Sequence, residues 1–261
     1  MRYLRLWRRF AIIALVREAE YRVNFLISAA QGVAELALAV LSLLLLYRFT
    51  DQVAGWSRAQ VLLLTGVYRL VDGLIALQIA PNMTAVSGYI RRGELDFLLL
   101  RPVSNQFLVS LRTLAPAEAL NVLTGAGLAL YAGNLAGVHW SLLGLATAAL
   151  FICCGVTLLY ALWFAIVTCS IWLVQVDTLD SLFYSLFETA RYPVAFFKGG
   201  LRAALTFVVP VAFATTLPTQ ALLGTGDPRL LAVGLAMAVA ALGATHLFWT
   251  FALRHYSSAS S

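Results

Sequence analysis

Charged residues that lie deep inside apolar stretches are the side chains most able to do chemistry in this sequence. Glu35, Arg69, Asp72 and Glu118 each lie well inside such a stretch. A charge at this depth in a bilayer costs several kcal/mol unless it is paired or hydrated. Arg69 and Asp72 are three residues apart, on one helical face, and Glu35 reaches a similar depth in the preceding stretch. They predict either a substrate path or gate, or an ionic cluster that fixes helix register.

Enzymatic and metal-binding motifs are missing from the sequence. Lys198 is the only lysine, and no G-x-x-x-x-G-K-[ST] loop contains it, so nucleotide hydrolysis by the P-loop route is excluded. The three histidines have no carboxylates at the spacing of a catalytic triad or an H-E-x-x-H site. The three cysteines share one apolar stretch without a histidine, which is typical of buried thiols rather than a metal site.

The composition is that of a membrane protein. Of the 261 residues, 61% are hydrophobic and 11% are charged. A soluble domain of this size has no place for so much apolar surface. The excess of basic residues consists almost entirely of arginines near the ends of apolar stretches. This placement indicates topology signals and contacts with lipid headgroups, and no basic groove predicts nucleic-acid binding.

Five apolar segments are long enough to cross a bilayer. They run from about Phe25 to Tyr47, Gln60 to Ile79, Gln106 to Tyr131, Ser141 to Val174, and Leu230 to Leu253. Residues 1–23 separate aromatic and aliphatic residues from arginines on opposite helical faces, which favours a helix in the membrane interface over a solvated arm. Pro81 predicts that the second helix ends near that residue. No linker or repeat divides the chain, so residues 1–261 are expected to form one membrane domain.

Arginines set the expected orientation and the number of crossings. Six precede the first span, and further arginines surround the connection between the second and third spans. The positive-inside bias places both termini and residues 87–104 in the cytoplasm, which requires an even number of crossings. The sixth crossing has two possible placements. Residues 201–223 contain Pro210 and Pro218, whereas residues 180–197 contain Asp180, Glu188 and Arg191.

Residues 87–104, which read SGYIRRGELDFLLLRPVS, form a charged segment between two apolar spans. A turn at Ser87 and Gly88 precedes a short amphipathic stretch, and Pro102 ends it because the residue before a proline disfavours helix. Its leucines can rest on the membrane bundle while its charges face the cytosol. The segment is therefore either a handle for an external partner or a simple interfacial loop.

This segment resembles the membrane-subunit family of type-2 ATP-binding-cassette (ABC) exporters. The resemblance rests on the run from Arg92 to Asp96 followed by residues 98–104, LLLRPVS. It extends to residues 190–194 (ARYPV), to residues 207–213 (FVVPVAF) with Pro218, and to the ending at residues 254–260. The likeness covers nearly the whole chain.

The resemblance implies an all-α integral membrane protein with six transmembrane helices and an interfacial N-terminal helix. It implies a cytoplasmic coupling helix, and re-entrant outer helices interrupted at Pro210 and Pro218, which favours residues 180–197 as the fifth crossing. It also implies that residues of the coupling segment bind a separate ABC ATPase and that the substrate is amphipathic or lipid-like. The coupling set is Arg91, Arg92, Gly93, Glu94, Leu95, Asp96 and Leu98. The residues expected to form either the translocation path or an intramembrane polar cluster are Glu35, Arg69, Asp72, Glu118, Glu188 and Arg191.

The expected assembly follows from the same resemblance. Two permease subunits, identical or related, meet in the bacterial inner membrane among its lipids. ATP and Mg²⁺ are bound by the partner ATPase, and this chain binds no cofactor. Two other classes stay open on the sequence. A secondary transporter or channel moves solute without an ATPase, and a membrane scaffold binds partners without any flux.

Overall fold

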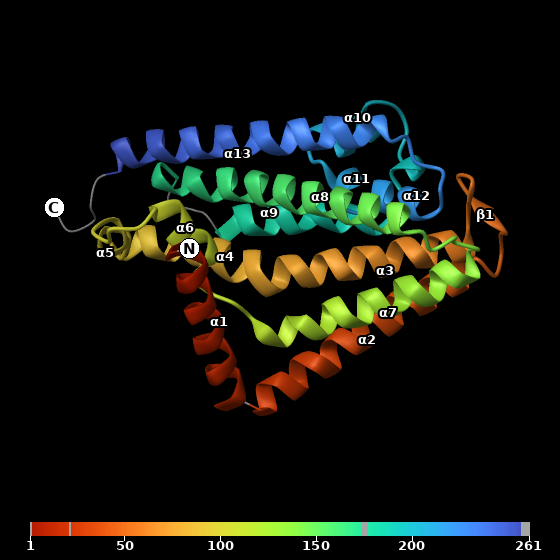
Figure 1. Cartoon of the computed structure of the whole chain (residues 1–261), viewed down its shortest axis with the longest axis horizontal. Helices are drawn as coiled ribbons and strands as arrows, with labels where there is room; N and C mark the ends of the chain where they lie inside the picture. Colours follow the sequence, from red (N-terminus) through yellow and green to blue (C-terminus); the bar gives the residue numbers. More distant parts are fainter. Residues whose placement is uncertain (1, 21, 174–176, 257–261) are drawn as a thin grey trace.

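The computed structural model describes residues 2–20, 22–173 and 177–256. Helix α1 (Arg2–Glu20) runs at a steep angle to the long helices, away from the end of the bundle near α6, and α2 (Arg22–Leu46) turns back from its end (Figure 1). No residue of α1 is buried. The N-terminal end of α1 touches the bundle through the rings of Tyr3 and Phe107, whose centroids are 4.8 Å apart. This amphipathic helix agrees with the pattern of residues 1–23.

A tight hairpin of β1 (Gln52–Val53) and β2 (Trp56–Ser57) connects α2 to α3 (Arg58–Leu74). Its turn residues, Ala54 and Gly55, both have positive φ, as the favoured two-residue hairpin turns require. Ser57 then caps α3 in a reciprocal capping box with Gln60.

The second helix does not end at Pro81, and this prediction from the sequence was wrong. It continues from α3 through a π-helical turn, η1 (Ile75–Ile79), into α4 (Ala80–Arg91). Proline lacks the N–H that would bond Leu77 O, and the Ala115 N–H supplies that bond instead at 2.9 Å. The wider π turn and this donor from another segment allow one helix to extend from residue 58 to 90.

The third predicted span, 106–131, is also divided in the structure. After α5 (Leu95–Leu99), α6 (Asn105–Leu111) is followed by an irregular stretch, the short turn η2 (Pro116–Glu118), and α7 (Ala119–Leu135). Asn82 holds the backbone of Thr113, donating to its carbonyl at 2.7 Å and accepting from its N–H at 2.8 Å. The helix breaks here because these backbone groups are bonded to α4 and η1 rather than to a preceding turn.

Helices α3 and α7 pack so closely that glycines are required at their contact. A β-carbon at Gly66 would meet the backbone of Ala129, and one at Gly125 would meet the backbone of Leu70. Gly73 approaches α7 in the same way at Val122. Small residues that let backbones approach are the usual means of helix association in membranes.

The other long helices are α8 (Leu142–Thr168) and α13 (Arg229–His255), which lie side by side (Figure 1). A short turn, η3 (Cys169–Ile171), extends α8. Helix α9 (Asp177–Phe187) then returns along the bundle and ends in two short turns, η4 (Glu188–Arg191) and η5 (Val194–Phe196). The stacked rings of Trp163 and Phe183, 4.1 Å apart, join α8 to α9.

Between α9 and α13, the chain forms a bent helical hairpin of α10 (Gly199–Phe207), α11 (Val211–Ala214) and α12 (Thr216–Leu222). The axes of α10 and the α11–α12 pair differ by 62°. Phe207 and Pro210 line a cavity with Ala161 and Leu162 of α8, so the apex reaches the second half of that helix. Ala221 lies near Gly144 at the first turn of α8, so the hairpin returns to the end where it began.

Four helices among the described residues are long and apolar enough to cross a membrane: Phe25–Leu46, Arg58–Ile90, Leu142–Ile171 and Arg229–His255. The bent hairpin adds a fifth if its two arms count as one span. The expectation of an all-α, multi-pass membrane protein is therefore confirmed at this level. Figure 1 places α5, α6 and the end of α13 at one end of the bundle, and β1 and α10–α12 at the other.

Candidate functional site

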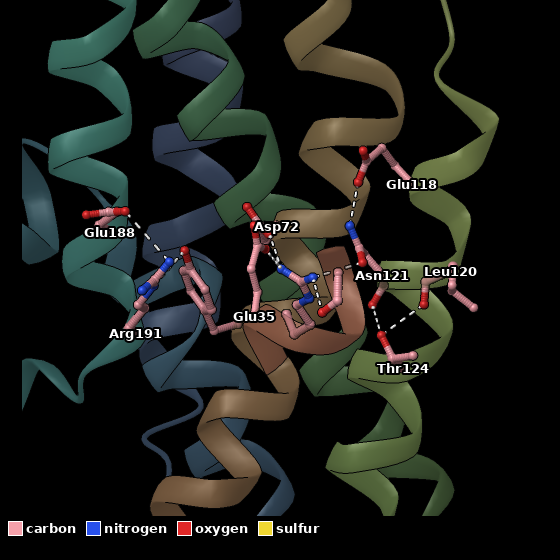
Figure 2. Close-up of polar contacts among 11 residues, drawn as sticks. Glu35, Asp72, Glu118, Leu120, Asn121, Thr124, Glu188 and Arg191 are labelled. Carbon is pink, nitrogen blue, oxygen red and sulfur yellow. Dashed lines mark hydrogen bonds and ion pairs between the residues drawn. The ribbon is translucent and has the colours of Figure 1, made fainter. Parts of the chain in front are cut away.

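Arg69 is the centre of a polar cluster inside the bundle, and Figure 2 labels its partners Glu35, Asp72 and Asn121. Its Nη1 contacts Glu35 Oε2 at 3.1 Å and Asp72 Oδ2 at 3.2 Å. Its Nη2 donates to the carbonyl of Gly32 at 2.8 Å and to Asn121 Oδ1 at 2.9 Å. Helices α2, α3 and α7 therefore meet at one guanidinium, and the structure brings together the Glu35, Arg69 and Asp72 singled out in the sequence.

Glu118 joins this cluster indirectly, through a residue that the sequence reasoning missed. The side-chain amide of Asn121 donates to Glu118 Oε2 while its oxygen accepts from Arg69. Glu118, the last residue of η2, and Asn121, in the first turn of α7, are three residues apart, the spacing of neighbours on one helical face. An asparagine so close to a carboxylate inside an apolar stretch was the signal that could have identified it.

Glu188 and Arg191 form a second polar group, on η4. Arg191 Nη2 lies 3.7 Å from Glu188 Oε1, and Arg191 Nε donates to Tyr68 Oη at 3.3 Å. The Arg191 guanidinium also lies 5.5 Å from the centroid of the Tyr68 ring, within the range of a cation–π contact. Tyr68 immediately precedes Arg69 in α3, so its contact with Arg191 connects the two polar groups.

A cavity of about 290 Å³ opens beside these residues, between α2, α3 and the end of η4. Its polar lining comes from the charged residues Glu35, Arg69 and Arg191 with two tyrosines, a serine and a threonine, and leucines of α2 supply most of the apolar wall. The side chain of Arg69 is only 8% exposed, whereas that of Glu35 is 67% exposed and that of Arg191 is 52% exposed. Arg69 therefore acts as the internal anchor, and Glu35 and Arg191 are accessible to a solute.

The segment 87–104 lies at the far end of α4, where α5 begins. Gly93 has φ +68°, a conformation that only glycine adopts without strain, and it turns the chain between the two helices. Arg92 Nε donates to Glu94 Oε1 at 2.7 Å. The hydrogen-bonded Arg92 guanidinium holds the pKa of Glu94 below its ordinary value. The side chain of Arg91 lies outside the described residues.

Helix α5 divides its apolar residues between the bundle and the solvent. Leu95 and Leu98 are buried in the main hydrophobic core, whereas Phe97 is 70% exposed and Leu100 is 82% exposed. These two exposed residues were missed as functional candidates, because the sequence pattern does not say which apolar residues of so short a helix face outward. These two exposed residues, which we call the apolar tip of α5, follow the Arg92–Glu94 ion pair in the sequence.

The end of α13 lies beside this segment. Burial raises the pKa of Tyr256, and the nearby carboxylate of Asp96 raises it further. The predicted tail motif reaches residue 260, and its last part lies outside the described residues. Pro210 and Pro218 lie elsewhere, in the bent hairpin: Pro210 precedes α11, and Pro218 stands in the first turn of α12, where a proline is tolerated.

These features define a class of protein: a multi-pass helical membrane protein with a polar cavity inside the bundle and an exposed helical segment at one end. The comparison with protein families makes this more specific. A profile of the family described as ABC-2 family transporter protein matches residues 33–260. The chain belongs to this family, and it is a membrane subunit of a type-2 ABC transporter. No curated protein and no solved structure matches the chain.

Proposed function

We propose that this chain forms half of the translocation pathway of an ABC exporter and is moved by a separate ATPase subunit. The observation that carries this proposal is the exposed α5 segment, with Phe97 and Leu100 at its tip and Leu95 and Leu98 fixed in the core. A membrane subunit without a nucleotide site must receive force from a partner. A short helix fixed to the bundle on one face and exposed on the other is suited to that task.

The proposed topology has six crossings: α2, α3–α4, η2–α7, α8, α9–η4 and α13. Residues 116–135 of η2 and α7 cover about 30 Å at the helical rise, close to the thickness of the hydrocarbon layer. The hairpin α10–α12 is the re-entrant element, because its apex passes the middle of α8 and its end returns to the first turn of α8. Its backbone at this depth is shielded by α8 and α13, as irregular structure in a membrane requires.

In this topology, the end that carries α5 faces the cytoplasm of a bacterial inner membrane, and both termini lie on that side. The proposed ATPase contact consists of the charged residues of the segment, Arg91, Arg92, Glu94 and Asp96, together with the exposed Phe97 and Leu100. Interfaces are commonly held by a desolvated apolar anchor inside a polar rim. Phe97 and Leu100 are suited to be the anchor, and Gly93 sets the angle at which α5 meets the partner.

The cavity beside Arg69 is the proposed part of the substrate path in this subunit. An amphipathic or lipid-like molecule needs an apolar wall and a polar contact, and the leucines of α2 with Glu35 and Arg191 supply both. A second permease, identical or related, completes the pathway. ATP and Mg²⁺ are bound by the ATPase, whose closure moves α5 and, through α4, the helices around the cavity.

The π turn η1 gives α4 a defined joint with α3 for this motion. Gln78 of η1 accepts from Trp7 Nε1 at 2.9 Å and donates to Thr113 O at 3.3 Å. A displacement of η1 and α4 is therefore transmitted to α1 and to the connection between α6 and η2. A π turn inside a long helix is frequently found at functional positions.

The double charge reversal Glu94→Arg with Asp96→Arg tests the coupling contact. We expect this variant to insert into the membrane normally and to lose co-purification of the ATPase. The matched control is Glu20→Arg with Asp51→Arg, which reverses two exposed carboxylates outside the segment. If the Glu94/Asp96 variant retains its ATPase as the control does, the coupling assignment is wrong.

A further inference from the structure

A second cavity, separate from the proposed path, lies where α1 meets α4 and the connection between α6 and η2. Its volume is about 880 Å³, within the range of small-molecule and cofactor sites. Phe10 and Ile13 of α1 and Leu114 of the connection line it with apolar surface. The cavity therefore has room and apolar walls for the upper part of a lipid molecule.

Three arginines from different parts of the chain line this cavity. Arg17 comes from α1, Arg101 follows α5, and Arg112 follows α6. Throughout residues 2–20, 22–173 and 177–256, none of the three forms an ion pair. All three residues are exposed, so their charges have no desolvation cost at this position. Three guanidinium groups around one cavity are complementary to a phosphate, which arginine binds through paired hydrogen bonds.

Glu18 is the only carboxylate among the described residues that line the cavity. Its Oε1 is buried and has no hydrogen-bond partner within the described part of the chain. The oxygen requires a donor, and a ligand that carries a hydroxyl or ammonium group next to its phosphate can provide one. The lining therefore has an excess of positive charge together with one unsatisfied acceptor.

From these residues, we infer that the cavity is a binding site for an anionic glycerophospholipid. The phosphate lies among Arg17, Arg101 and Arg112, a headgroup hydroxyl donates to Glu18, and an acyl chain runs along Phe10, Ile13 and Leu114. Basic pockets at the cytoplasmic surface of membrane helices are a known means of binding anionic lipid headgroups. A bound lipid would fix α1 against α4 and the α6–η2 connection. The inference concerns lipid binding and holds independently of ATPase coupling.

Native mass spectrometry of the full-length, delipidated chain tests the site. When phosphatidylglycerol, phosphatidylethanolamine and phosphatidylcholine are added at equal concentration, we expect the chain to retain phosphatidylglycerol most, phosphatidylethanolamine less and phosphatidylcholine least. Phosphatidylglycerol has both the net charge and the hydroxyl donors, phosphatidylethanolamine has only the donor, and phosphatidylcholine has neither. Equal retention of phosphatidylcholine and phosphatidylglycerol by the wild-type chain would overturn the inference, and this arm needs no variant.

A triple variant, Arg17→Gln with Arg101→Gln and Arg112→Gln, supplies the second arm. Each arginine near a lipid surface contributes roughly a fivefold change in affinity, so we expect the triple variant to bind phosphatidylglycerol at least about tenfold more weakly. The matched control is Arg2→Gln with Arg5→Gln and Arg9→Gln, which removes the same charge from α1 outside the cavity. Unchanged binding in the cavity variant, or an equal loss in the control, would show that the cavity is not the site.

Discussion

Replacement of Arg69 by methionine separates the structural part of the polar cluster from the part that a solute can reach. The change keeps a long side chain but removes the charge and all four hydrogen bonds to Glu35, Asp72, Gly32 and Asn121. The side chain of Asp72 is only 24% exposed, so its carboxylate is left without a counter-charge in a desolvated place. Removing one partner of a buried ion pair costs about 3–5 kcal/mol of stability.

Glu35 is expected to behave differently, although it contacts the same guanidinium. Its side chain is 67% exposed, and exposed ion pairs contribute only about 0–1 kcal/mol. Glu35→Gln should therefore leave the free energy of unfolding within about 1 kcal/mol of wild type. If Glu35 lines the substrate path, the same change alters transport. The two substitutions thus distinguish an ionic cluster that holds helices from a residue that meets the substrate.

The assay is unfolding of the purified chain by sodium dodecyl sulfate in mixed micelles, followed by far-ultraviolet circular dichroism. Asp72→Asn added to Arg69→Met provides the decisive comparison, because it removes the carboxylate that the first change leaves unpaired. We expect the double variant to recover at least about 2 kcal/mol of the loss. If Arg69→Met costs less than about 1 kcal/mol, or if Glu35→Gln costs as much as Arg69→Met, the reasoning from burial is wrong.

Three further predictions concern glycines. Gly125→Val should lower the free energy of unfolding by about 3 kcal/mol or more, because its β-carbon meets the backbone of α3. Gly127→Val has open space around it and should lower that free energy by about 1 kcal/mol or less. The melting temperatures of the two variants in detergent test this difference. Gly155→Leu should displace the bent hairpin from α8, because Ala214 of the hairpin lies against Gly155. Gly243→Leu should leave the hairpin in place, because no atom lies near Gly243. The rate of proteolysis within residues 199–222 distinguishes the two outcomes. Gly93→Ala should strain the turn between α4 and α5 by about 1–2 kcal/mol because of its left-handed backbone. It should clearly weaken ATPase binding while it changes the melting temperature of the whole chain only slightly.

Much of the fold could be predicted because a membrane imposes simple requirements. Apolar stretches of sufficient length identified α2, α8 and α13, and the amphipathic pattern identified α1. Charges inside spans need partners, and the similar depth of Glu35 and Arg69 with the spacing of Arg69 and Asp72 made a cluster of the three geometrically possible. The family resemblance, which rested on residues 92–104 and on the shorter motifs at 190–194, 207–213 and 254–260, is confirmed by the match over residues 33–260.

The departures arise where long-range contacts override a local rule. Pro81 predicts a helix end, but a π turn and the N–H of Ala115 compensate for the missing donor. The apolar run 106–131 predicts one helix, but Asn82 binds the backbone at Thr113 and the helix breaks. In both cases the bonding partner comes from a distant part of the sequence. The exposure of Phe97 and Leu100 likewise depends on how α5 is seated on the bundle, which the order of residues does not determine.

Cross-linking from the tip of α5 tests the central proposal most directly. The three natural cysteines are replaced, and Phe97→Cys, at a side chain that is 70% exposed, carries a short thiol-specific cross-linker. Leu142→Cys serves as the control, because Leu142 is the first residue of α8 and lies at the end of the bundle opposite α5. We predict that Phe97→Cys reacts only with reagents on the cytoplasmic side and becomes linked to a P-loop ATPase. Labelling of Phe97→Cys from the outer side, or solute transport by the reconstituted chain with no ATPase present, would contradict the account.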